Sequence, residues 1–304
     1  MRVFIHLLFL LVAFAWPGCD SGGGPGGDAG VDGDANDGEP QDADGDAADG
    51  DAGDPLLFEL ELVESTGAGG GSAAAYAWVD NPVVGDGAWI PTLSAGDCVY
   101  NTPEDPGFCD PACDPGQVCR ADDTCGPPVS RVSAGRITIT GLTVGLALHP
   151  VEPYLYYEPA WSPEPADGDL FAGGDLVTAT AVGGTVPAFT VSSTGVDALE
   201  TSLPCPLALS PGADLEVTWT PGGGVGDRVL FALQSGNHGL QFSSVTCEVA
   251  DTGFLRVDAA LIDAFAADFH PVQLWILRRQ HEGAVAAGPV DVRLRAVSRV
   301  ACYQ

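Results

Sequence analysis

The sequence contains no lysine, and all eleven of its basic residues are arginine. Without a lysine amine the chain has no Walker A phosphate loop, no lysine Schiff base and no Ser-Lys catalytic dyad. Its formal charge of -31 at pH 7 repels nucleic acids and anionic membrane surfaces. We therefore expect no nucleic-acid partner and none of these three chemistries.

Long hydrophobic runs are also scarce. The one candidate runs from Val3 to Trp16, is interrupted only by His6, and follows a basic residue, Arg2. It is shorter than the about 20 apolar residues that a membrane-spanning helix needs. A short basic start followed by such a run is typical of a signal peptide, which we place at residues 1–18.

The segment after this run resembles a bacterial lipobox, in which Gly18 precedes a lipid-modified Cys19. Trp16 and Pro17 depart from the usual pattern, and cleavage after Ala15 is the alternative. Lipid attachment at Cys19 leaves eight of the nine cysteines, an even number that suits disulfides in an oxidising compartment. Cleavage after Ala15 would leave nine cysteines and one thiol without an intramolecular partner.

Residues 19–54 form a low-complexity stretch of Asp, Gly and Ala with 12 acidic residues and no basic one. Such a composition cannot form a core and predicts a disordered acidic linker. Asp42, Asp44 and Asp46 have the spacing of the first ligands of an EF-hand, but Ala47 stands where the turn needs glycine. We therefore expect only loose binding of divalent cations.

Residues 55–304 form the folded body, and most of it shows apolar side chains at every second position. Gly, Pro and Asp clusters separate these runs, a pattern typical of an antiparallel β-sandwich. Only Asp258 to Phe269 has helical spacing, with Asp258 as the expected cap. The alternating runs include Phe58 to Leu62, Ile137 to Ile139, Val229 to Leu233, Val272 to Ile276 and Val290 to Leu294.

A cysteine-rich segment, residues 98–126, is predicted as a small insertion in the β body. Its polar composition cannot bury much surface, so crosslinks are expected to hold it. Pairing Cys109 with Cys119 and Cys113 with Cys125 would form a small knuckle, although the spacing does not determine the pairing. Zinc is the alternative, but there is no Cys-x-x-Cys pair and no nearby histidine.

Four features occur together in this chain: the lipobox-like segment, the Asp/Gly linker, the stretch from Ala73 to Trp78 and the cysteine segment from Cys109 to Cys125. In this combination the chain resembles the uncharacterised predicted lipoproteins that myxobacteria encode in large numbers. The resemblance implies placement on the cell envelope. It implies no activity and no site residue.

Trp219 lies in an alternating run between Cys205 and Cys247. In this respect the body resembles immunoglobulin-like domains, in which a core tryptophan contacts a disulfide between the two sheets. The resemblance implies a Cys205–Cys247 bridge, and Cys98 would then pair with Cys302 by elimination. The tyrosine expected just before the second cysteine is absent, because Ser243 to Thr246 stands there.

Catalytic signals are weak. Asp251-Thr252-Gly253 is the core of the aspartic protease signature, but it occurs once where two copies are needed, so a turn between strands is the preferred interpretation. His149 and His270 precede prolines, and His238 and His281 lack motif partners, so we expect exposed loop residues. We predict no enzyme, no cofactor and no metal site, and keep a hydrolase without a recognisable motif as an alternative.

The most suggestive patch consists of aromatic residues in a proline-rich loop: Tyr154, Tyr156, Tyr157 and Trp161. Aromatic faces on an exported β scaffold can stack on sugars or anchor a partner protein. The alternative is that these side chains only pin the loop to the body.

Taken together, the sequence predicts a cell-envelope lipoprotein whose β-sandwich serves as a binding or structural module. The lipid would hold it in the membrane, and we place it on the outer membrane or cell surface rather than the inner membrane. An envelope protein or a polysaccharide is the expected partner, and a carbohydrate-binding or adhesion role is the alternative.

Overall fold

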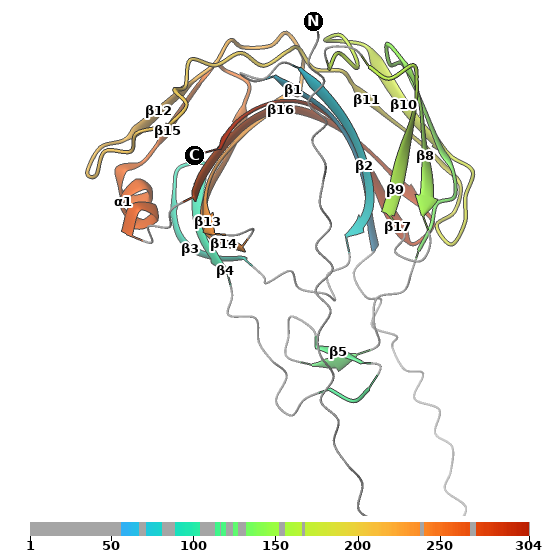
Figure 1. Cartoon of the computed structure of the whole chain (residues 1–304), viewed down its shortest axis with the longest axis horizontal. Coiled ribbons are helices and arrows are strands. Elements are labelled where there is room, and N and C mark those ends of the chain that lie inside the picture. The colour runs from blue at the N-terminus through green and yellow to red at the C-terminus, as the bar shows by residue number, and fades with distance from the viewer. Residues whose placement is uncertain are drawn as a thin grey trace, which may run out of the picture. The chain divides into compact units, whose positions relative to one another are not determined.

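Strands dominate the chain, which confirms the predicted all-β class (Figure 1). The computed structural model describes residues 56–66, 71–80, 89–103, 113–115, 117–119, 124–126, 132–151, 156–165, 168–237, 240–267 and 272–303. The elements are β1 (Leu56–Thr66), β2 (Ser72–Asp80), β3 (Trp89–Ala95), β4 (Cys98–Pro103), β5 (Val118–Cys119), β6 (Cys125–Gly126), β7 (Ile137–Thr140), β8 (Gly145–Val151), β9 (Tyr156–Ser162), β10 (Leu176–Ala181), β11 (Phe189–Thr194), β12 (Leu215–Thr218), β13 (Arg228–Asn237), β14 (Leu240–Ala250), β15 (Phe254–Val257), α1 (Ala259–Ala267), β16 (Val272–Ala287) and β17 (Val290–Tyr303).

An eight-stranded sheet with the order β2-β1-β17-β16-β13-β14-β4-β3 organises the body. It curves strongly, and a five-stranded sheet (β11-β10-β7-β8-β9), the β12–β15 pair and α1 lie on its convex side (Figure 1). Neighbouring strands pair antiparallel, as predicted, except that β1 and β17 pair in parallel. A parallel pair needs a long connection, and here the connection is nearly the whole body.

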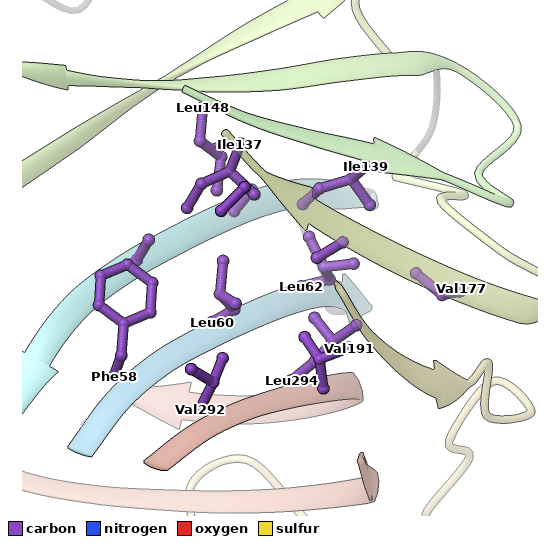
Figure 2. Packing of buried hydrophobic residues seen from close by; sticks show 14 of the residues in the cluster. Phe58, Leu60, Leu62, Ile137, Ile139, Leu148, Val177, Val191, Val292 and Leu294 are labelled. Atoms are coloured by element: carbon purple, nitrogen blue, oxygen red, sulfur yellow. The ribbon is translucent and has the colours of Figure 1, made fainter. Parts of the chain in front are cut away.

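One hydrophobic core lies between the eight-stranded and the five-stranded sheet (Figure 2). Phe58, Leu60 and Leu62 of β1 point into it, which confirms the predicted alternation along this strand. Side chains from the opposite sheet meet them, among them Ile137, Ile139, Leu148, Val177 and Val191.

A second core lies under the other half of the large sheet, against β12, β15 and α1. The predicted helix is confirmed over Ala259–Ala267, and its last two predicted residues, 268 and 269, lie outside the described residues. The Asp258 carboxylate caps it by accepting the Ala260 N–H at 2.8 Å. On β16 the predicted face is wrong, because the fully buried side chains are Trp275 and Leu277 rather than Leu274 and Ile276.

The disulfides correct the expected pairing. Cys98 is bonded to Cys247, its direct neighbour across β4 and β14, with Cα atoms 4.1 Å apart. Cys205 is bonded to Cys302. The expected Cys205–Cys247 and Cys98–Cys302 bridges are therefore wrong, and the disulfide on which the immunoglobulin-like resemblance rested is absent.

The physical reason is strand order. Trp219 follows β12 in a separate two-stranded sheet, whereas Cys247 lies deep in the eight-stranded sheet beside β4. Cys98 is thus a residue of the large sheet and not part of the cysteine-rich insertion.

Within the insertion, the Cys113–Cys125 bond is confirmed. Cys109 and the side chain of Cys119 lie outside the described residues, as do the predicted signal peptide, Cys19 and the acidic linker. In the ranges that are described, no helix is long and apolar enough to cross a bilayer.

Candidate functional site

A cavity of about 510 Å³ opens between β2 and β9. β2 ends the eight-stranded sheet and β9 ends the five-stranded sheet, so the cavity lies at an edge of the sandwich (Figure 1). We call it the edge slot. It is lined by Ala73, Ala74, Ala75, Tyr76, Ala77, Trp78, Tyr157, Pro159 and Trp161.

The slot exists because β2 carries small side chains where its neighbour carries large ones. Ala75 and Ala77 pair with Leu62 and Leu60 of β1 and face the same core. An alanine fills much less of the space between two sheets than a leucine, so the gap between the sheets stays open at this edge.

Aromatic residues and Pro159 complete the lining, and Tyr76 and Trp78 alternate with Ala75 and Ala77, which places them at the rim of the slot on the other face of β2. Tyr76 is 48% exposed, whereas Trp78 and Trp161 are half-buried. Tyr157 is fixed, because its hydroxyl accepts the Ala134 N–H at 2.8 Å and its ring meets Phe58 edge-on at 5.7 Å. Burial raises the pKa of Tyr157, so its hydroxyl stays protonated at neutral pH.

Of the four predicted site aromatics, Trp161 and Tyr157 line the slot, with Tyr157 serving mainly as a core residue. They lie on strand β9 rather than in a loop. Tyr154 and the side chain of Tyr156 are outside the described part. Tyr76 and Trp78 were not predicted as site residues, although their alternation with alanine was the available signal.

None of the residues that line the slot is charged, so its polar groups are those of the backbone, the Tyr76 and Tyr157 hydroxyls and the Trp78 and Trp161 indole N–H groups. In the described ladders β2 pairs only with β1, and β9 pairs only with β8. Their outer edges therefore present backbone N–H and C=O groups that no neighbouring strand uses. Aromatic walls and backbone edges suit a neutral ligand with apolar faces and hydroxyl or amide groups.

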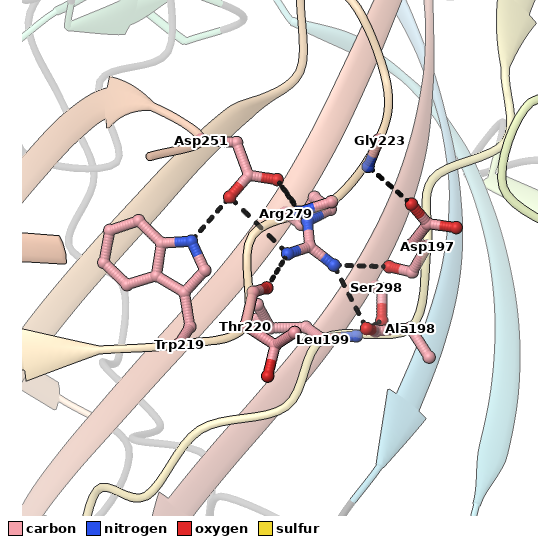
Figure 3. A network of polar contacts seen from close by, with 10 residues as sticks. Asp197, Ala198, Leu199, Trp219, Thr220, Gly223, Asp251, Arg279 and Ser298 are labelled. Atoms are coloured by element: carbon pink, nitrogen blue, oxygen red, sulfur yellow. Dashed lines mark hydrogen bonds and ion pairs between the residues drawn. The ribbon is translucent and has the colours of Figure 1, made fainter. Parts of the chain in front are cut away.

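A buried polar network lies where the two cores meet (Figure 3). Arg279 is 1% exposed, and its Nε donates to Asp251 Oδ2 at 2.7 Å. Its Nη1 donates to the Asp197 and Ala198 carbonyls at 2.9 and 3.1 Å, and its Nη2 donates to the Thr220 carbonyl. We call these residues the Arg279 network.

Asp251 therefore has a structural environment. Its carboxylate also accepts hydrogen bonds from Trp219 Nε1 at 2.5 Å and from the Gly222 N–H at 2.8 Å. Burial alone would raise the pKa of Asp251, but these hydrogen bonds and that from Arg279 outweigh it and lower the pKa. The Asp-Thr-Gly segment is a turn between β14 and β15, as predicted, with Gly253 at a φ of 87°.

Ser193, His281 and Asp227 are neighbours, but they do not form a catalytic triad. Ser193 is buried and donates to the carbonyl of His281 at 2.9 Å, while His281 Nδ1 accepts the Thr194 N–H at 3.2 Å. Neither oxygen of Asp227 has a hydrogen-bond partner. Ser193 Oγ also lies 3.1 Å from His281 Nδ1. The contacts of His281 thus join β11 to β16, and the Asp227 carboxylate does not orient the imidazole as a triad requires.

The histidine predictions need correction. His281 is half-buried in strand β16 rather than exposed in a loop, and His149, though exposed, lies in strand β8 rather than in a turn. His238 and His270 lie outside the described residues.

Among the residues with a described position, no three His, Cys, Asp or Glu side chains are placed to hold a metal ion. Comparison with protein-family models, curated proteins and solved structures finds no match for this chain. The assignment of a function to the edge slot therefore rests on the geometry of the slot alone.

Proposed function

We propose that this chain is an exported, lipid-anchored protein of the cell envelope whose β body binds a neutral saccharide in the edge slot. The signal-peptide pattern and the lipobox-like Cys19 support the placement. The observation that supports the ligand is a slot with aromatic walls and no charged lining residue in a chain of charge -31.

The chemistry of the slot suits a sugar ring. The C–H faces of a pyranose can stack on Tyr76, Trp78 or Trp161, and its hydroxyls can bond to the outer backbone edges of β2 and β9. The negative charge of the chain favours a neutral glycan over a polyanionic one.

A partner protein is the second candidate, because both strands that flank the slot have one unpaired side in the described ladders. An extended segment could add to β2 and place alternate side chains over the alanines. Replacing Tyr76 with alanine distinguishes the two candidates. Strand addition depends on the backbone of β2 more than on the exposed ring of Tyr76, so peptide binding should survive this change.

The test is binding of neutral oligosaccharides from the envelope, followed by calorimetry and by tryptophan fluorescence. We expect Trp161→Ala to weaken binding by about 2 kcal/mol, the loss typical of a central aromatic contact. Tyr76→Ala should also weaken binding with little loss of stability, because Tyr76 is 48% exposed.

Trp89→Ala is the matched control, because Trp89 is a 37% exposed tryptophan on β3, at the opposite end of the large sheet. It should bind like the wild type. Unchanged saccharide affinity in both Tyr76→Ala and Trp161→Ala would exclude the edge slot as the site. If the wild type binds no saccharide but binds an extended peptide, the second candidate is favoured.

A further inference from the structure

A row of polar residues crosses four neighbouring strands on the face of the large sheet opposite the first core. Ser72, Ser65, Arg299 and Arg278 are register partners along this row, on β2, β1, β17 and β16 in turn. They alternate along their strands with buried residues of the first or second core, so they point to the other, concave face.

The carboxylates around this row pair with arginines other than Arg299. Arg295 has two carboxylate partners, Glu59 and Glu282, at 2.7 and 2.8 Å. Arg278 has one, Glu61, at 2.7 Å.

The charge of Arg299 has no such neutralising partner. Its Nε and Nη2 both donate to Ser65 Oγ, at 3.1 and 2.9 Å, and no carboxylate pairs with it in the described part of the chain. Arg299 and Arg278 are moreover direct cross-strand neighbours, an arrangement of like charges that destabilises a sheet. In a chain with 42 acidic residues, an arginine without a carboxylate partner beside a second arginine is unexpected.

The row also holds unused donors. Arg278 Nε is buried without a hydrogen-bond partner. Ser65 Oγ accepts from Arg299, so its own hydrogen remains available to donate to a ligand. Burial lowers the pKa of Arg278, Glu61 opposes this, and Arg295 and Arg299 lower it further. A bound anion would relieve the mutual repulsion of these guanidinium groups.

We propose that Arg299, Arg278 and Ser65 form a binding site for a single oxyanionic group, of the kind carried by sulfate and phosphate. Guanidinium groups recognise such oxygens through paired N–H donors, and the serine hydroxyl adds a further donor. The site contains no residue of the edge slot, so it does not depend on the proposed saccharide binding. The overall negative charge of the chain favours a compact anion over a polyanion.

The experiment is a titration of the full chain with sodium sulfate at an ionic strength held constant with sodium chloride, followed by thermal unfolding and calorimetry. We expect sulfate to stabilise the wild type in a saturable manner. Sulfate should bind roughly tenfold more weakly to Arg299→Gln, because this variant lacks the guanidinium group. Arg293→Gln is the control, because Arg293 lies on the same face of β17 and pairs with Glu282 at 3.7 Å. It should keep wild-type affinity.

Stability without sulfate separates binding from a structural role. If Arg299 serves an anion, Arg299→Gln should be at least as stable as the wild type without sulfate and less stable at saturating sulfate. If Arg299 serves only to hold Ser65, the variant should be less stable by the same amount in both conditions, and this result would overturn the proposal. Sulfate that stabilises the wild type no more than chloride does would also overturn it.

A second titration identifies the source of the anion. A sugar sulfate ester that binds more tightly than inorganic sulfate, while its uncharged parent sugar does not bind the row, would assign the oxyanion to a larger ligand. Equal affinity would assign it to the free ion.

Discussion

Two aspartates near Arg279 illustrate how the surroundings, and not the residue type, set the pKa of a carboxyl group. Hydrogen bonds from Arg279, Trp219 and Gly222 lower the pKa of Asp251 despite its burial. Asp227 is 5% exposed and receives no hydrogen bond, and burial raises its pKa, an effect that His281 only partly offsets. At neutral pH the ionised Asp227 therefore opposes folding.

We predict that Asp227→Asn stabilises the protein by about 1 kcal/mol at pH 7, since a neutral unsatisfied group costs less to bury than a charged one. Because folding raises the pKa of Asp227, its favourable contribution is complete below the unfolded value near 3.8 and is lost as the pH rises through the folded value. The advantage of the variant should thus be absent in acid and appear as the pH rises. Urea unfolding at a series of pH values measures it.

Asp251→Asn is the control with the opposite sign. The lowered pKa of Asp251 stabilises the fold above its ordinary value of 3.8, and this contribution is lost as the pH falls through the folded value. The Asp251→Asn variant should be less stable than the wild type at neutral pH, and the difference should shrink in acid.

For Asp227→Asn, a difference in unfolding free energy from the wild type that stays constant with pH would contradict the raised pKa of Asp227.

At the scale of the elements, the Arg279 network joins β16 to three other segments. Arg279→Met would remove the cation that pairs with Asp251, and it would also remove the donor to the carbonyls of Asp197, Ala198 and Thr220. We expect a loss of about 3–5 kcal/mol, as is usual when one partner of a buried ion pair is removed. Chemical denaturation measures this loss.

Arg228→Met provides the comparison. Arg228 pairs with Glu248 on the surface, where both side chains are about half exposed. Such pairs contribute roughly 0–1 kcal/mol. Equal losses in Arg228→Met and Arg279→Met would show that the buried network does not hold these segments together.

Local patterns predicted much of the fold. The alternation in β1 and the Asp258-capped helix are confirmed because each depends on residues close together in the sequence. The buried face of β16 was not predictable in this way, since Leu274 and Ile276 are only half-buried while the fully buried register contains Arg279. A buried arginine contradicts the hydrophobic pattern, and only its distant partners make its burial tolerable.

The pairing of distant segments explains the other failures. Cys98 and Cys247 are 149 residues apart and meet only because β4 pairs with β14. The edge slot likewise requires that β2 and β9 end two different sheets, which no local pattern reveals. Trp161 was predicted from its aromatic neighbours, but the alanines of β2 that line the same slot were not.

At the scale of the whole molecule, a single large sheet supports two cores. The first core lies under the five-stranded sheet, and the second lies under β12, β15 and α1. β16 and β17 extend along both cores and connect them through their shared backbone hydrogen bonds. The two halves are therefore expected to unfold together rather than as separate domains.

Intact mass of the purified mature protein under non-reducing conditions tests the proposed tether. Three disulfides account for six of the nine cysteines, and Cys109 with Cys119 would complete four bridges and leave only Cys19. We therefore expect a chain that starts at Cys19, carries two or three acyl groups and has no free thiol. A chain that starts at Trp16 with one free thiol would instead indicate a secreted protein without a lipid anchor, and Cys19 would then be the residue to search for a covalent partner.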